Sequence, residues 1–327
     1  MIERRAFLKG LTAASAGIVS RARSGFAAEP PPETKRIRLG KYPFDLACVA
    51  PLWVADELLR AEGFTTVEYV DHPGDSVLLA EGKIDLIFLD APGLILSVDE
   101  GKSIVGLAGI HGGCYELFGS TQVHSVRELR GRTVAVLTPG RQAFVAAMTS
   151  YVGLDPRRDV KIVLVPDAKE RFIDGGVDAL LGFPPDPQEL RAKKIGHVLV
   201  NTALDRPWSQ YFCCFASGNR DFVQKHPVAT KRALRAIVKA TDICAAEPER
   251  VVRSLVERGF LKDHDYSIQA LREVPYRRWR DYDSADTIRF LALRMHETGV
   301  IKSNPQKIIA DGMDWRVVNE LKRELKG

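Results

Sequence analysis

Two successive runs of short apolar segments, each alternating with helix-like segments, constrain the fold of this chain more than any other feature. In the first run the strand-like segments are 37–39, 65–70, 84–89 and 104–110, and the helix-like segments are 50–59, 76–81 and 92–100. Ile84–Leu89, which reads IDLIFL, is continuously apolar, and such a run is typical of a parallel strand buried on both faces. Glycines at 82 and 101 follow helix-like segments, as expected at helix ends.

The same rhythm begins again at Ser125. Its helix-like segments are 125–129, 141–152, 168–174 and 186–192, and its strand-like segments are 133–137, 160–165, 177–181, 197–200 and 211–216. Further helix-like segments follow at 221–225, 228–247, 249–259, 284–298 and 315–325. Alternating strands and helices favour parallel sheets. We therefore predict an α/β fold of two lobes, each an open, mostly parallel sheet with flanking helices, and a helical C-terminal region. The crevice between two such lobes is the expected binding site.

The first 28 residues predict the compartment. Met1–Lys9 reads MIERRAFLK, a short apolar run follows, and small residues stand at the end of the segment. This layout is typical of a cleaved export signal, and Arg4-Arg5 followed by Phe-Leu-Lys resembles a twin-arginine (Tat) signal. We expect a signal over 1–28, a proline-rich linker over 29–35, and a periplasmic protein.

Charge and cysteine content exclude some classes of protein. Of the net charge of +5, residues 1–28 carry +4, from five basic residues against Glu3, so the mature chain is near +1. This balance lacks the excess of positive charge that is typical of nucleic-acid-binding proteins. An odd number of cysteines, five, argues against a disulfide scaffold.

Several segments occur in an order that is similar to one family. They are APLWVADELL (50–59), GKIDLIFLDAPGLILSVDEGK (82–102), VRELRGRTVAV (126–136) and the helical segment 219–251. The second resembles a "G-x-x-D-h-h-h-x-x-x-P" segment, and the third resembles "x-x-D-L-K-G-K-x-V-x-V". Together they resemble the periplasmic solute-binding proteins of ABC importers, in the NMT1-like branch for nitrate, taurine, alkanesulfonates and thiamine-precursor pyrimidines.

The resemblance implies a type 2 periplasmic-binding fold with lobe one at 36–115 plus 216–327 and lobe two at 116–215. The two chain crossings are expected near 115–120 and 211–216. The implied function is the capture of a small organic ligand for a membrane permease by a monomer without enzymatic activity. Two alternatives stay open: an enzyme resembling the thiamine-pyrimidine synthases, and a ligand-sensing subunit for another membrane partner.

Loops at the carboxyl ends of strands supply the candidate ligand-binding residues. Thr138, Gly140, Arg141 and Gln142 lie between a strand and a helix, where free backbone N–H groups attract anions. Arg141 offers a bidentate grip on a carboxylate or sulfonate, or is an ordinary solvated arginine. In the corresponding loop of lobe one, Asp90 and Ala91 precede a helix; Asp90 either caps that helix or contacts a ligand.

Aromatic residues suggest a ring-shaped ligand instead of an anion. Tyr42 and Phe44, with Asp45 beside them, follow the first strand, and Phe183 follows the strand at 177–181. Aromatic rings at these ends suit an apolar or planar ligand. The alternative for residues 42–45 is a surface turn.

A third loop contains His111, Cys114 and Tyr115 after the strand at 104–110. These side chains offer polar atoms to an organic ligand. One His-x-x-Cys without a second pair is weak evidence for a metal, and neighbouring strand residues such as Cys213 and Cys214 are expected to point to opposite faces. We therefore expect no metal. Because nucleotide-binding and hydrolase motifs are absent from the sequence, we also expect no cofactor.

Overall fold

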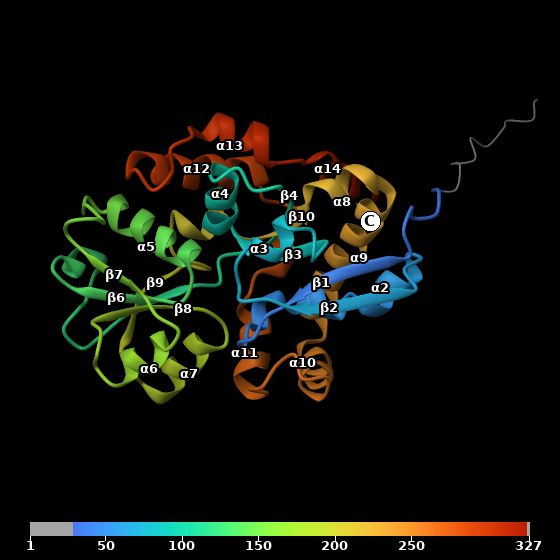
Figure 1. The fold of residues 1–327 in the computed structure, drawn as a ribbon. Coiled ribbons are helices and arrows are strands. Elements are labelled where there is room, and N and C mark those ends of the chain that lie inside the picture. The colour runs from blue at the N-terminus through green and yellow to red at the C-terminus, as the bar shows by residue number, and fades with distance from the viewer. Residues whose placement is uncertain (1–28, 326–327) are drawn as a thin grey trace, which may run out of the picture. The chain divides into compact units, whose positions relative to one another are not determined.

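The first sheet belongs to the unit that begins at Pro32 and contains five strands. The computed structural model describes residues 29–325, so the expected export signal, 1–28, lies outside the described residues. The strand order is β2 (Thr66–Asp71), β1 (Arg36–Lys41), β3 (Leu86–Asp90), β10 (Phe212–Asn219) and β4 (Ile104–Gly112). β1 is parallel to β2 and β3, whereas β10 runs antiparallel to β3 and β4 (Figure 1).

The second sheet repeats this plan. Its order is β7 (Lys161–Leu164), β6 (Thr133–Val136), β8 (Ala179–Gly182), β5 (Glu116–Gly119) and β9 (His197–Asn201). β6 is parallel to β7 and β8, and β5 is antiparallel to β8 and β9. The two-lobed α/β fold of mostly parallel sheets is thereby confirmed, with one antiparallel strand within each sheet. We call the first sheet with its helices the first lobe, and the second sheet with its helices the second lobe.

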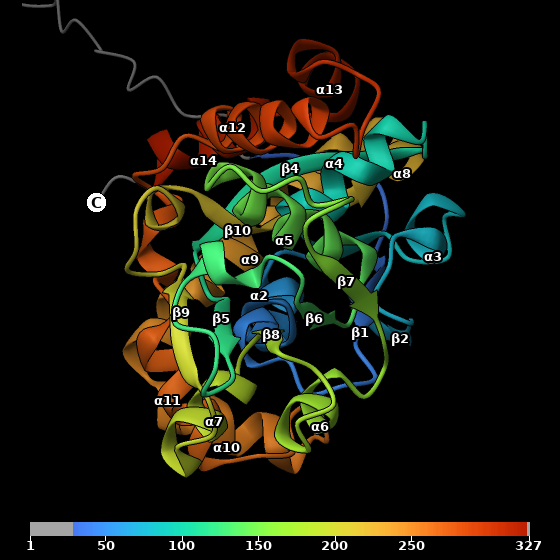
Figure 2. The ribbon, with the colours of Figure 1, turned by 90° about the vertical axis from the view of Figure 1, so that its left-hand side faces the viewer.

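Helices flank both sheets. They are α1 (Ala50–Val54), α2 (Asp56–Ala61), α3 (Val77–Ala80), α4 (Ala91–Asp99), α5 (Pro139–Tyr151), α6 (Ala168–Ile173), α7 (Asp186–Lys193), α8 (Arg220–Lys225), α9 (Pro227–Ala246), α10 (Pro248–Glu257), α11 (Asp265–Glu273), α12 (Ser284–Glu297), α13 (Pro305–Gly312) and α14 (Arg316–Glu324). Short 3-10 helices are η1 (Ala47–Val49), η2 (Val126–Leu129), η3 (Trp208–Gln210) and η4 (Tyr276–Trp279). Figure 2 shows α12 and α13 lying over the ends of α4 and α5.

The chain passes between the sheets twice. It leaves the first sheet after Gly112 and enters the second at Glu116; it leaves the second after Asn201 and returns at Phe212. The strand that follows each passage is the antiparallel one. The exact lobe boundaries given above stay a prediction.

The sequence pattern missed some helical elements. The expected helix over 50–59 is interrupted at Ala55 and forms α1 and α2, and the expected helix over 125–129 is the 3-10 helix η2. α11 and α13 were not predicted, although α13 has a clear start signal: Asn304 accepts from Lys307 N–H at 2.9 Å, and Pro305 stands at its first position.

A continuous apolar core lies beneath the first sheet and extends into the second lobe. Trp53, Trp279 and Tyr276 are among its largest fully buried side chains. In the described part of the chain no helix has the length and apolar character needed to cross a membrane.

Candidate functional site

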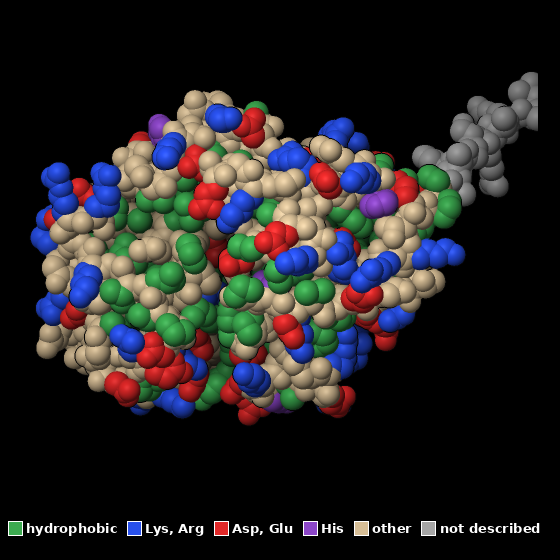
Figure 3. Space-filling view, viewed as in Figure 1, with side chains coloured by type: hydrophobic (Ala, Val, Ile, Leu, Met, Phe, Trp, Pro, Cys, Tyr) green, Lys and Arg blue, Asp and Glu red, His purple; other side chains and the backbone are tan. Residues whose placement is uncertain are grey.

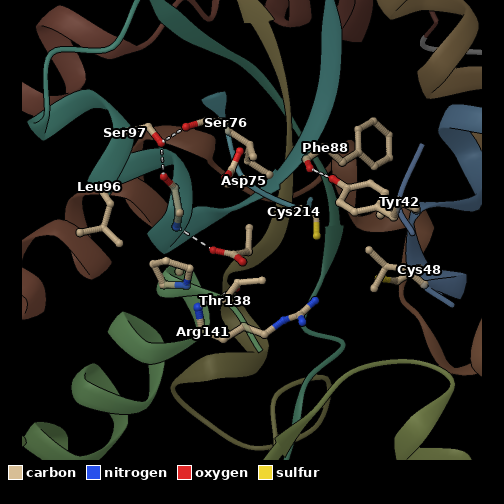
Figure 4. Close-up of a pocket in the computed structure, with 18 of the residues that line it drawn as sticks. Tyr42, Cys48, Asp75, Ser76, Phe88, Leu96, Ser97, Thr138, Arg141 and Cys214 are labelled. Atoms are coloured by element: carbon tan, nitrogen blue, oxygen red, sulfur yellow. Dashed lines mark hydrogen bonds between the residues drawn. The ribbon is translucent and has the colours of Figure 1, made fainter. Parts of the chain in front are cut away.

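A cavity of ≈170 Å³ lies where the two sheets face each other. The first lobe supplies most of its wall and the second lobe supplies the start of α5. The residues are Tyr42, Phe44, Leu46, Cys48, Val49, Gly74, Asp75, Ser76, Phe88, Leu89, Asp90, Gly93, Leu96, Ser97, Glu100, Lys102, Tyr115, Thr138, Pro139, Gly140, Arg141 and Cys214. Figure 3 shows hydrophobic side chains on both sides of the groove between the lobes, and Figure 4 shows the cavity itself.

Two helices begin at this cavity, one from each lobe. Asp90 ends β3 and caps α4, because its Oδ1 accepts from Gly93 N–H at 2.6 Å. Thr138 caps α5 by accepting from Arg141 N–H at 3.3 Å. Helix starts carry partial positive charge. The Asp90 carboxyl already occupies the start of α4, whereas the start of α5, capped by the neutral Thr138, favours an anion in the cavity.

Gly140 of the second lobe lies directly against Asp90 of the first. A Cβ atom on Gly140 would lie 2.2 Å from Asp90 Oδ1 and 2.9 Å from Asp90 Oδ2. Gly140 belongs to the first turn of α5 and is not among the glycines with positive φ. No left-handed backbone requires a glycine at this position, and the close approach of the lobes is the physical reason for it.

Arg141 is a buried cation without a carboxylate partner. The residue is 3% exposed, and no carboxylate of residues 29–325 forms an ion pair with it, although its charge interacts with Asp90. The guanidinium carbon lies 3.7 Å from the ring centre of Phe183 and 5.6 Å from those of Phe44 and Tyr115. Nε and Nη1 are buried and have no hydrogen-bond partner. Figure 4 shows this side chain extending into the cavity toward Cys214 and Cys48.

The charge of Arg141 affects its neighbours. Burial raises the pKa of the Asp90 carboxyl, and the positive charge of Arg141 opposes that rise. Burial would lower the pKa of Arg141, but the nearby Tyr115 and Asp90 hold it above its usual value. The guanidinium therefore stays positively charged at the centre of the interlobe groove.

Direct contacts between the lobes hold the groove closed in this structure. Ala47 N–H of the first lobe donates to Pro184 O of the second at 3.1 Å. Glu273 of α11 accepts from Gln188 Nε2 at 2.8 Å and from Arg191 Nη2 at 2.5 Å, both in α7. These contacts, with the pair Asp90 and Gly140, define a closed arrangement.

The structure brings seven of the sequence-predicted residues to the cavity wall: Tyr42, Phe44, Asp90, Tyr115, Thr138, Gly140 and Arg141. Phe183 lines a neighbouring hollow instead, and its ring stacks on Arg141. Tyr42 donates a hydrogen bond to Phe88 O, so its hydroxyl is already engaged.

His111 and Cys114 do not line the cavity and lie in the interior among the other cysteines. Three further predicted residues also lie elsewhere. Asp45 Oδ2 accepts from Lys262 N–H at 3.2 Å and Asp263 N–H at 3.0 Å, so it anchors a distant loop. Ala91 is fully buried in α4, and Gln142 points to a different surface hollow beside Ile162. In each case an ordinary structural role, which the loop position alone does not exclude, accounts for the residue.

Sequence reasoning missed the polar end of the cavity. Ser76 Oγ lies 2.7 Å from Ser97 Oγ, and Lys102 Nζ donates to Ser76 at 3.3 Å. Ser97 lies in the last turn of α4, and Lys102 follows the end of that helix; the sequence prediction covered only the loop before α4. A one-turn helical spacing from Gly93 to Ser97 is the signal that places Ser97 on the cavity side of α4.

The cysteines also differ from expectation. Cys213 and Cys214 were expected to point to opposite faces, but their Sγ atoms lie 3.9 Å apart. The register of β10 against β4 shifts on both sides of Cys214, which breaks the strict alternation of faces. Cys48, His111 and Cys114 lie beside them, so the His-x-x-Cys segment does not stand alone.

Known structures show the class of fold. The nitrate-binding protein NrtA of Synechocystis PCC 6803 is 18% identical with a TM-score of 0.75, over 91% of this chain and 90% of that one. The alkanesulfonate-binding protein SsuA of Xanthomonas axonopodis pv. citri is 17% identical with a TM-score of 0.70, over 88% of this chain and 100% of that one. The chain thus has the two-lobed fold of periplasmic binding proteins.

The family follows from the sequence. The model described as "NMT1/THI5 like" matches residues 64–251, more than half of the chain, and the chain belongs to this family. A curated relative, the bicarbonate-binding protein CmpA of Synechococcus elongatus, is 26% identical over 109 residues. That match spans 33% of this chain and only 24% of the relative's length.

Proposed function

We propose that this protein is the solute-binding component of an ABC importer and that it captures a small organic anion in the interlobe cavity. The observation that carries the proposal is the buried guanidinium of Arg141 at the cavity wall, whose Nε and Nη1 have no hydrogen-bond partner. A buried charge without a partner is unfavourable unless a ligand neutralises it. A carboxylate or sulfonate is the natural partner, because its two oxygens match the guanidinium fork.

The aromatic residues complement this charge. Phe44 of the first lobe and Phe183 of the second have ring centres 5.7 Å apart, and both rings face Arg141. They exclude water from the guanidinium and so strengthen its attraction for an anion. An uncharged pyrimidine would pack against the rings but would leave the cation unpaired. The geometry therefore favours the anion over the neutral ring.

The cavity volume limits the ligand. A cavity of about 150 Å³ holds one benzene molecule, and the cavity here measures ≈170 Å³. In this closed arrangement we expect one compact anion, with its charged group at Arg141 and a polar substituent toward Ser76 and Ser97.

The role in transport rests on relatives. The proteins of similar fold are described as binding nitrate, alkanesulfonate and, for the sequence relative, bicarbonate. All are small anions. This supports a periplasmic binding protein that delivers an anion to a membrane permease. That the protein is a monomer and performs no catalysis belongs to the same proposal. A twin-arginine route of export is part of the same proposal.

A thermal-shift screen of the mature protein tests the proposal. The panel pairs small carboxylates and sulfonates with uncharged molecules of the same shape. A true ligand at 100 times its Kd stabilises the protein by about 2.7 kcal/mol. We expect stabilisation by an anion and none by its neutral counterpart. Stabilisation by neutral pyrimidines or amines alone would contradict the anion assignment.

A further inference from the structure

Five side chains with soft or borderline metal-binding atoms meet in the interior beside the cavity. We call Cys48, His111, Cys114, Cys213 and Cys214 the thiol cluster. The ligand atoms of Cys48, His111 and Cys214 lie within 4.8 Å of one another, as do those of His111, Cys114 and Cys213. All five residues are buried, and none of the cysteines forms a disulfide.

His111 has the orientation of a metal ligand. Its Nδ1 lies 2.7 Å from Gly112 O, which as an acceptor requires the proton on Nδ1. Nε2 then carries a free lone pair, is buried and has no hydrogen-bond partner. His111 belongs to both groups of three. Histidines that bind metals are commonly fixed by such a bond from the other ring nitrogen. A merely structural histidine would leave this acceptor unsatisfied in the core, which is unfavourable.

The sulfur positions suit a shared ion. Cys114 Sγ and Cys213 Sγ are 3.2 Å apart, and Cys213 Sγ and Cys214 Sγ are 3.9 Å apart. Zinc–sulfur bonds of about 2.3 Å in a tetrahedral site place two sulfurs about 3.8 Å apart. Small side-chain movements therefore suffice to bring three sulfurs and Nε2 around one ion.

The backbone assembles the cluster from distant segments. The register shifts of β10 bring Cys213 and Cys214 together. Cys114 lies in the first passage between the sheets, where a Cβ on Gly113 would meet Thr202 O at 1.9 Å. Only glycine permits this approach, and the approach sets the position of Cys114 beside β10.

We propose that the thiol cluster binds one thiophilic d10 ion, Zn²⁺ or Cu⁺, through His111 Nε2 and cysteine thiolates. Sulfur-rich sites with one imidazole suit both ions. Each thiol that coordinates releases a proton to solvent. Three thiolates leave the site with a net charge of −1 for Zn²⁺ and −2 for Cu⁺. Cys48 and Cys214 line the cavity, so the ion has a path from solvent.

Metal titration of the full mature chain tests the proposal. The protein is reduced and purified without oxygen, and Zn²⁺ and Cu⁺ are titrated separately in competition with chromogenic chelators. We expect one equivalent of at least one ion per chain. Cys114→Ser and His111→Gln should each weaken binding at least tenfold. The matched control is Cys244→Ser, because Cys244 is the buried cysteine of α9 outside the cluster; it should leave binding unchanged.

A second measurement needs no variant. Co²⁺, a spectroscopic substitute for Zn²⁺, should give thiolate-to-cobalt charge-transfer absorption in the wild-type protein. No binding of either ion to the fully reduced protein, or equal weakening by Cys244→Ser, would overturn the proposal. So would a native disulfide between Cys114 and Cys213, seen by mass after alkylation. None of these outcomes bears on anion binding at Arg141.

Discussion

Gly140 and Asp90 touch across the groove between the lobes: a Cβ on Gly140 would lie 2.2 Å from Asp90 Oδ1. Gly140→Val should therefore hold the lobes apart. Because a ligand favours closure only through its greater affinity for the closed form, an obstacle to closure weakens binding directly. We expect at least a tenfold loss of affinity, about 1.4 kcal/mol, by titration calorimetry.

A matched control is Gly176→Ala. Gly176 has no positive φ, lies outside the cavity, and the nearest atom to its new Cβ, Arg171 O, is 3.4 Å away. Circular dichroism should show both variants folded. Unchanged affinity in Gly140→Val would show that the lobes do not close at this point.

Arg141→Met should remove anion binding. The substitution keeps an apolar chain against Phe183 but deletes the guanidinium, and loss of a hydrogen bond to a charged group costs about 1.5–3 kcal/mol. We expect at least a tenfold loss of affinity for the anion found in the screen. The ligand-free protein should lose little stability, because the variant removes a buried charge that has no carboxylate partner. Arg127→Met, at an exposed position of η2, serves as control. Equal affinities in wild type and Arg141→Met would remove Arg141 from the site.

Glu116 should make stability depend on pH. Burial raises the pKa of this carboxyl to about 7, and Arg191 opposes the rise. Because the folded-state pKa lies above the ordinary glutamate pKa of 4.5, the folded protein binds more protons in this window, and stability falls as pH rises from about 4.5 through 7. Glu116→Gln stays neutral and should not show this fall. Between pH 4.5 and 8 its free energy of unfolding should therefore rise, relative to that of wild type, by roughly 3 kcal/mol at most.

Urea unfolding at several pH values measures this difference. Glu170→Gln, at an exposed position of α6, is the matched control and should follow wild type. A Glu116→Gln variant with the same pH dependence as wild type would place the titrating group elsewhere.

The export signal makes a prediction that depends on sequence alone. The mature protein should begin within a few residues of Glu29, and replacing Arg4-Arg5 with two lysines should retain the precursor in the cytoplasm if export uses the twin-arginine route. Intact-mass analysis of periplasmic and cytoplasmic fractions decides this. A full-length chain that begins at Met1 in the wild-type cytoplasm would contradict it.

The sequence predicted the fold well because strand and helix periodicity is local. Ile84–Leu89 reads as a buried parallel strand, and β3 occupies 86–90. Asp90, Thr138 and Arg141 were predicted site residues because they stand in loops at strand ends, and all three line one cavity. Parallel strands place their carboxyl ends at one edge of a sheet. α13 could also have been predicted, because Asn304 followed by Pro305 is a helix-start signal.

Long-range placement could not be predicted. Cys48 comes from η1 and Cys213 from β10, and only tertiary folding brings these segments together. The strand bulge that aligns Cys213 with Cys214 has no signal in FCCFAS, since alternation of faces is the default expectation. Asp45 likewise bonds to a loop more than two hundred residues away.

A crystal structure of the mature protein with the anion from the screen tests the central claim most directly. We predict that the anionic group lies in the interlobe cavity with oxygens within hydrogen-bond distance of Arg141 Nε and Nη1, the atoms that lack partners here. Phe183 should remain stacked on the guanidinium. A ligand bound outside this cavity, or an Arg141 that pairs with a carboxylate of the protein while the ligand lies elsewhere, would contradict the account.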